Sequence, residues 1–222
     1  MKKIVTAVAL SLLAVGVISL FESVFILSYW PKSMIKASCF IAAIAAYCLI
    51  FKEDAVRLLN VKKELPSKKL LISMVFVYLV IITAYLILKE RIDLSGIREN
   101  LLQKEGLTKN NFIFIFAYII FINSFLEESF FRGFIYNVFK DQGHPVWGIV
   151  YGSLLFSVYH LGIVALWFDP LILAVCIVGL ALAGAFLQLV CIREDNLLGS
   201  FIVHGCANLA INTIGVLMLF GS

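Results

Sequence analysis

Charged residues are scarce in this sequence. Only 14% of its residues are charged, against about a quarter in an ordinary soluble domain, whereas 62% are hydrophobic and the mean hydropathy is +1.02. The net charge of +4 comes from 18 basic and 14 acidic residues, most of which lie between the apolar runs. No basic patch of a nucleic-acid-binding protein is present. The composition predicts an integral protein of a lipid bilayer, with no nucleic-acid partner.

The sequence also lacks the motifs of several familiar sites. Its five cysteines fall inside or at the ends of apolar runs, with no C-x-x-C pair: Cys39, Cys48, Cys176, Cys191 and Cys206. We therefore expect no disulfide framework. The zinc-protease motif HExxH is missing as well, and no serine or cysteine stands in a nucleophile constellation.

Apolar runs long enough to cross a membrane, which takes ~20 residues, dominate the chain instead. The predicted spans are 1–30, 34–51, 70–88, 111–139, 146–161, 170–192 and 197–220. A re-entrant piece near 162–168 would make eight. The fold class expected is all-α, a polytopic transmembrane bundle of about seven to eight spans. No internal repeat or low-complexity linker interrupts it.

The first run begins like a signal peptide, with two lysines before an apolar centre. After the small-residue tripeptide at 14–16, however, apolar residues continue to Trp30 rather than giving way to a polar mature start. We interpret the run as a retained membrane span.

Residues 89–110 separate two parts of the chain. Apolar residues recur among charges there, which suits a helix along the membrane surface, although a solvated loop is an equally good interpretation. The predicted organisation is therefore 1–110, N-terminal spans with an amphipathic connector, and 111–222, a helical core, within one structural domain.

Lysine and arginine distribution predicts the orientation. With the N-terminus in the cytoplasm, ten of these residues lie on the cytoplasmic side and seven outside, as the positive-inside rule favours. Small size and the lack of an organelle-targeting signal suggest a bacterial plasma membrane.

Six polar or ionisable residues stand out within the predicted spans: Glu127, Glu128, Arg132, His160, His204 and Asn208. A charge at bilayer depth costs ~3 kcal/mol on insertion scales, so such residues usually face a functional cavity. Other polar residues in the spans are single and scattered, and we interpret them as ordinary packing or hydrogen-bonding groups: Glu22, Asn123, Gln188 and Asn212.

Helical spacing divides these residues into groups. Glu128 and Arg132 are four apart and predict an ion pair. Glu127 lies about 100° around the helix from Glu128, which leaves it without a local partner and makes it the candidate for chemistry. His204 and Asn208 share a face of one span, and Phe156 lies one turn from His160 in another.

Depth estimates place the group in one layer. At ~1.5 Å per residue, Glu127, His160, His204 and Asn208 lie about 10 to 21 Å from the expected cytoplasmic helix ends, with about 5 Å of uncertainty. Three helices are therefore expected to bring a carboxylate, two imidazoles and an amide together.

Two chemistries suit this set, and both hydrolyse an amide with an activated water. In one, Glu127, His160 and His204 bind a divalent metal such as Zn²⁺. In the other, Glu127 takes a proton from a water that His160 also holds, while His204 and Asn208 stabilise the oxyanion.

Three motifs carry a family resemblance. EESFFR at 127–132, FSVYH at 156–160 and HGCAN at 204–208 match the EExxxR, FxxxH and HxxxN motifs of the CPBP family. This family comprises the CAAX-protease and bacteriocin-processing proteins, also called Abi proteins. The chain resembles it over about residues 111–212, with the three motifs in the family's order on separate apolar spans.

The resemblance implies an intramembrane endopeptidase whose cavity opens toward the cytoplasm. By motif position, Glu127 would be the general base or a metal ligand, and His160, His204 and Asn208 would complete the site. Glu128 and Arg132 would support it, with Phe156 from the second motif. Members of the family are named metalloproteases, yet a metal-free glutamate mechanism has been argued for the CAAX-processing branch.

The substrates expected are a peptide pheromone, a bacteriocin precursor or a regulatory membrane protein. A non-catalytic immunity protein or membrane scaffold of the same family is a second hypothesis. A proton or metal transporter that uses the same Glu and His residues as a relay is a third.

Overall fold

The computed structural model describes residues 1–25, 27–62, 64, 67–165 and 167–220. Within these residues the protein is helical and has no strand, as the composition predicts. Among the described residues, seven helices are long and apolar enough to cross a membrane. They are α1 (Lys2–Val24), α2 (Tyr29–Phe51), α4 (Leu70–Leu88), a continuous helix from α6 to α8 (Phe112–Asp141), α9 (Pro145–Val164), α10 (Pro170–Glu194) and α11 (Leu197–Phe220).

The described residues hold no eighth span. The alternative of a re-entrant piece over 162–168 is wrong for its first part, because α9 continues to Val164. Residue 166 of that piece lies outside the described residues.

The prediction for the first run was also wrong at its end. The run was expected to continue to Trp30, but α1 ends at Val24 and Phe25 is extended, while α2 begins at Tyr29 rather than Met34. Pro31 explains the new boundary, because a proline is well tolerated in the first turn of a helix. The link between the two helices is itself apolar, which is why hydropathy alone did not reveal it.

The described part of the chain also contains three short helices, α3 (Ala55–Leu59), η1 (Lys89–Arg91) and α5 (Leu94–Gln103). The connector predicted as either a helix or a loop therefore contains a helix. The carboxylate of Asp93 caps α5 by accepting a hydrogen bond from the backbone N–H of Gly96 at 2.9 Å. Ile97 is the buried residue of this helix.

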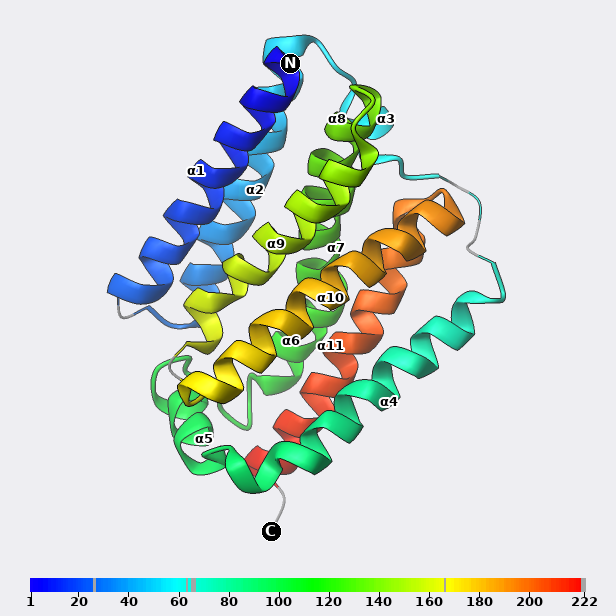
Figure 1. The fold of residues 1–222 in the computed structure, drawn as a ribbon. Helices are drawn as coiled ribbons and strands as arrows, with labels where there is room; N and C mark the ends of the chain where they lie inside the picture. The colour runs from blue at the N-terminus through cyan, green and yellow to red at the C-terminus, as the bar shows by residue number, and fades with distance from the viewer. Residues whose placement is uncertain (26, 63, 65–66, 166, 221–222) are drawn as a thin grey trace.

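The long helices pack largely as neighbouring pairs. Helix α1 lies against α2, α9 against α10, and α4 against α11. Figure 1 shows the continuous helix, α6 to α8, running through the middle of this arrangement, with the two termini at opposite ends of the bundle. The middle helix is the one that carries Glu127, Glu128 and Arg132.

Aromatic packing forms the core beside these charges. The Phe40 ring of α2 stacks on Phe130 with 4.1 Å between ring centroids. Phe131 and Phe134 from the middle helix and Tyr159 from α9 are buried in the same cluster. Because interiors packed in this way resist rearrangement, the core holds the middle helix firmly where the charged residues begin.

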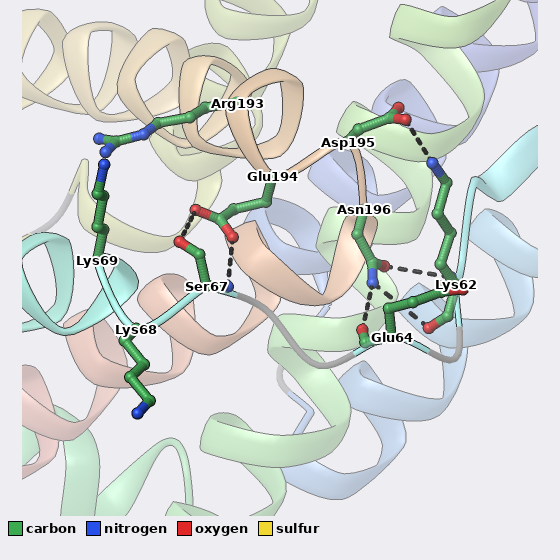
Figure 2. A pocket seen from close by; sticks show the side chains of 9 residues that line it. All are labelled: Lys62, Glu64, Ser67, Lys68, Lys69, Arg193, Glu194, Asp195 and Asn196. Carbon is green, nitrogen blue, oxygen red and sulfur yellow. Dashed lines mark hydrogen bonds and ion pairs between the residues drawn. The ribbon is translucent and has the colours of Figure 1, made fainter.

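A polar hollow lies at the corner between α10 and α11 (Figure 2). There the amide of Asn196 donates to the backbone oxygen of Glu64 at 3.0 Å, and Glu194 accepts from the backbone N–H of Ser67 at 2.7 Å. Lys62, and then Asn60, lower the pKa of Asp195 below its usual value through hydrogen bonds to its carboxylate. None of the polar residues singled out within the predicted spans lines this hollow. Its hydrogen bonds attach the segment before α4 to the ends of α10 and α11.

Candidate active site

The middle helix departs from α-helical geometry on both sides of the glutamates. Segment α7 (Ser124–Glu128) lies between two π-helical stretches, η2 (Tyr118–Asn123) and η3 (Ser129–Ile135). π-Helical turns are rare in proteins as a whole, and those that do occur often lie at functional sites. Both Glu127 and Glu128 are buried in the bundle.

The two oxygens of Glu127 have different surroundings. Oε1 accepts from the Asn123 amide at 2.9 Å and from the Tyr159 hydroxyl at 3.1 Å. It also lies 3.7 Å from the Lys36 ammonium. Oε2 is buried and, within the described part of the chain, has no hydrogen-bond partner. The carboxylate is therefore held through Oε1, whereas Oε2 has no hydrogen-bond partner among the described residues.

Both histidines face that second oxygen. The Nε2 atom of His204 lies 3.7 Å from Glu127 Oε2, and Nε2 of His160 lies 4.0 Å from it. These distances are too long for direct hydrogen bonds. Three helices thus bring a carboxylate and two imidazoles together, as the motifs predict.

The other ring nitrogen of each histidine is already engaged. Nδ1 of His160 lies 2.7 Å from the backbone oxygen of Phe156, which can only accept, so Nδ1 carries the proton. Nδ1 of His204 lies 2.8 Å from Oε1 of Glu128. In both rings this contact fixes the orientation and directs Nε2 toward Glu127.

The predicted ion pair between Glu128 and Arg132 is present, with 3.0 Å between Oε1 and Nη1. Arg132 also donates to the backbone oxygen of Gly184 on α10 at 3.1 Å, and its guanidinium stacks over the Phe156 ring at 4.4 Å. Glu128 therefore has two partners, Arg132 and His204. Helical spacing predicted only the first, because His204 comes from another helix.

Asn208 reaches the same region but with its amide in use. Its Nδ2 donates to the Ser124 hydroxyl at 2.8 Å and lies 3.3 Å from the backbone oxygen of Ile119. An oxyanion contact would require this amide to leave one of these partners, so that role of Asn208 stays a prediction.

Sequence reasoning missed three residues that contact Glu127. The expectation that Glu127 has no local partner was wrong, because Asn123, set aside as an ordinary packing or hydrogen-bonding group, lies one turn earlier on the same helix and donates to Glu127. The side chain of Lys36 on α2 is only 12% exposed and lies against Glu127. The predicted span 34–51 put Lys36 in its first turn, whereas α2 begins at Tyr29 and places it further inside the helix. Tyr159 gave no signal beyond its place next to His160.

A glutamate with two histidines is a donor set that catalytic zinc uses. Among the described residues, however, no three His, Cys, Asp or Glu side chains are arranged so that they could hold a metal ion. As placed, Glu127, His160 and His204 do not fit a zinc centre, and the predicted zinc set stays a prediction.

Comparison with protein families decides which class of protein this geometry belongs to. Residues 109–210 match the family model described as Type II CAAX prenyl endopeptidase Rce1-like. These residues form an Rce1-like domain of the CPBP family. The Rce1-like domain contains all three motifs, and its bounds lie close to the 111–212 of the resemblance. No curated protein and no solved structure matched the chain.

The Rce1-like family is a family of proteases. Together with the seven apolar helices of the described residues, this indicates a multi-pass membrane protein with a domain of a protease family.

Proposed function

We propose that this protein is an intramembrane endopeptidase that hydrolyses a peptide bond of a peptide or membrane protein with a water activated by Glu127 and His160. The observation that carries the proposal is the buried Oε2 of Glu127, which has no hydrogen-bond partner among the described residues and faces the Nε2 atoms of both histidines. A buried acceptor without a partner is costly, and the spacing of 3.7 and 4.0 Å between this oxygen and the two Nε2 atoms suits a bound water.

The activation step uses two acceptors. Two atoms 4.0 Å apart both lie within hydrogen-bond reach of one water oxygen. Because Nδ1 of His160 donates to Phe156, Nε2 is free to accept one water proton. Glu127 Oε2 accepts the other and removes it as the water oxygen attacks the carbonyl carbon.

The tetrahedral intermediate then has to be stabilised and broken down. His204 donates a hydrogen bond from Nε2 to the oxyanion when both ring nitrogens hold a proton, and its Nδ1–H then donates a hydrogen bond to the Glu128 carboxylate. When the C–N bond breaks, Glu127 returns its proton to the leaving amine. The products are one new carboxylate and one new amine, and Glu127 is regenerated.

The family of the matched domain and the membrane setting support a class of substrate. We propose a bacterial plasma-membrane enzyme with its N-terminus in the cytoplasm, acting on a peptide pheromone, a bacteriocin precursor or a regulatory membrane protein. Support comes from the CAAX endopeptidase family of the matched domain and from the excess of Lys and Arg at the N-terminal end of the bundle.

Cleavage of defined peptides tests the proposal. The purified full chain would be given a farnesylated, internally quenched peptide ending in a CAAX sequence and its unprenylated counterpart, beside Glu127→Gln and Glu127→Ala. Wild-type protein should cleave one of them, and both variants should lose about 100-fold or more of kcat. Variants that cleave like wild type at an equal protein level would reject Glu127 as the general base. A wild-type protein that cleaves neither peptide would reject the protease and favour an immunity or scaffold protein.

A further inference from the structure

A buried lysine lies against the proposed general base. Lys36 is on α2, outside the residues 109–210 that match the family model. Its side chain is 12% exposed, and within the described ranges Glu127 is the one carboxylate at ion-pair distance, with 3.7 Å between Nζ and Oε1. Burying a lysine ammonium is unfavourable unless an opposite charge compensates it. The contact therefore stabilises both charges.

Three groups from three helices converge on Glu127 Oε1. Asn123 comes from the middle helix, Tyr159 from α9 and Lys36 from α2. Lys36 is the only one of the three that carries a charge. Because all three contacts fall on Oε1, they fix the rotation of the carboxylate and leave Oε2 facing His160 and His204.

Lys32 shows what an otherwise similar lysine does elsewhere. It lies one turn earlier on α2 and is also buried, but its ammonium pairs with Glu22 at 3.0 Å and Glu105 at 2.6 Å. That cluster joins α1, α2 and the chain after α5, and it has no ion pair with Glu127 in the described structure. Lys32 is thus a control for the loss of a buried ammonium without loss of a contact to Glu127.

We propose that Lys36 is a positioning residue for the hydrolysis, which holds Glu127 by Oε1 so that Oε2 is aligned with the water and the two histidines. The proposal rests on the proposed function. It assigns Lys36 no contact with the substrate. Its removal should therefore lower kcat and leave KM nearly unchanged, because misplacing a catalytic group by a fraction of an ångström slows the chemical step.

Two measurements on the full chain test the proposal. In the first, unfolding temperatures are compared for Lys36→Met, Glu127→Gln and the double variant. Each single change strands a buried charge and should lower the midpoint by about 5 °C or more, whereas the double variant strands neither and should recover most of that loss. Lys32→Met combined with Glu127→Gln should give additive shifts. Additive shifts for Lys36→Met and Glu127→Gln would overturn the proposal.

In the second, kinetics are measured with the farnesylated quenched peptide. Lys36→Met should lower kcat about 10- to 100-fold with KM within about twofold, and Lys36→Arg should regain most of the rate because it restores the charge. Lys32→Met should keep kcat within about threefold. A Lys36→Met enzyme with normal kcat, or a Lys36→Arg enzyme as slow as it, would overturn the positioning role. A wild-type protein that cleaves neither peptide would reject the proposed function, whereas the coupling in unfolding temperature would still establish the pair.

Discussion

The Nδ1 atom of His204 lies 2.8 Å from Oε1 of Glu128, the same oxygen that pairs with Arg132 at 3.0 Å. Glu128 therefore links the guanidinium on its own helix to an imidazole on α11. The adjacent glutamates of the EExxxR motif thus have separate tasks. Glu128 orients a histidine and neutralises an arginine, and Glu127 presents an oxygen to both histidines.

Removal of Glu128 should destabilise the protein as well as inactivate it. Glu128→Ala strands Arg132 as a buried charge, and breaking such a pair costs about 3–5 kcal/mol. We expect a low membrane yield and a lowered unfolding temperature in detergent. Glu128→Ala combined with Arg132→Met should recover part of the yield, because neither charge then remains. A normal yield for Glu128→Ala alone would show that the pair does not support the site.

Replacing either histidine should abolish most of the activity, but the two replacements should lower the stability of the protein by different amounts. His204→Ala removes a hydrogen bond to a buried carboxylate, a bond worth about 1.5–3 kcal/mol. His160→Ala removes a contact with a carbonyl of its own helix. Each variant should lose about 100-fold or more of kcat, and His204→Ala should unfold at the lower temperature. Equal unfolding temperatures for the two variants would contradict the bridging role of Glu128.

A glycine on α10 offers a packing test with a control on the same helix. A Cβ added at Gly184 would lie 3.1 Å from the Ser153 Cα of α9, whereas one added at Gly179 would meet nothing within 4 Å. Gly184→Ala should cost about 1–3 kcal/mol through overpacking and also displace the carbonyl that accepts from Arg132. Gly179→Ala should be neutral or slightly stabilising. Equal thermal unfolding of both variants would contradict the close approach of α9 and α10.

Metal dependence can be tested without knowing the substrate in the cell. Because water spans the gaps between Glu127 and the histidines in our account, cleavage should continue after chelation with EDTA and phenanthroline. Purified wild-type protein should carry less than one equivalent of zinc. The zinc content of the His160→Ala and His204→Ala proteins should be the same as that of wild type. Activity that is lost on chelation and restored by Zn²⁺ would instead favour the zinc set of Glu127, His160 and His204.

Much of the fold follows from the sequence because a bilayer demands long apolar runs. The spans predicted at 70–88 and 197–220 coincide with α4 and α11, since charged residues flank the first run on both sides and precede the second. The boundary between α1 and α2 did not follow. There an apolar link joins two apolar helices, and hydropathy does not separate turn residues from span residues when both are hydrophobic.

The sequence predicted the contacts of the site that lie within one helix, but not those that depend on how different helices pack together. Spacing within one helix predicted the pair of Glu128 and Arg132, and the three motifs predicted which helices meet. The contact of Lys36 with Glu127 depends on how α2 packs against the middle helix, which no spacing within either helix contains. The distinct surroundings of the two oxygens of Glu127 likewise require side-chain positions from three helices.

The central claim is that Glu127 directs a water straight onto the peptide carbonyl, and a single turnover in H₂¹⁸O tests it most directly. With enzyme in excess over the farnesylated peptide, wild-type protein should place one ¹⁸O atom in the new C-terminal carboxylate during the first turnover. Glu127→Gln should form no product on that timescale. A first-turnover product without ¹⁸O, or product formed by Glu127→Gln at the wild-type rate, would contradict the account.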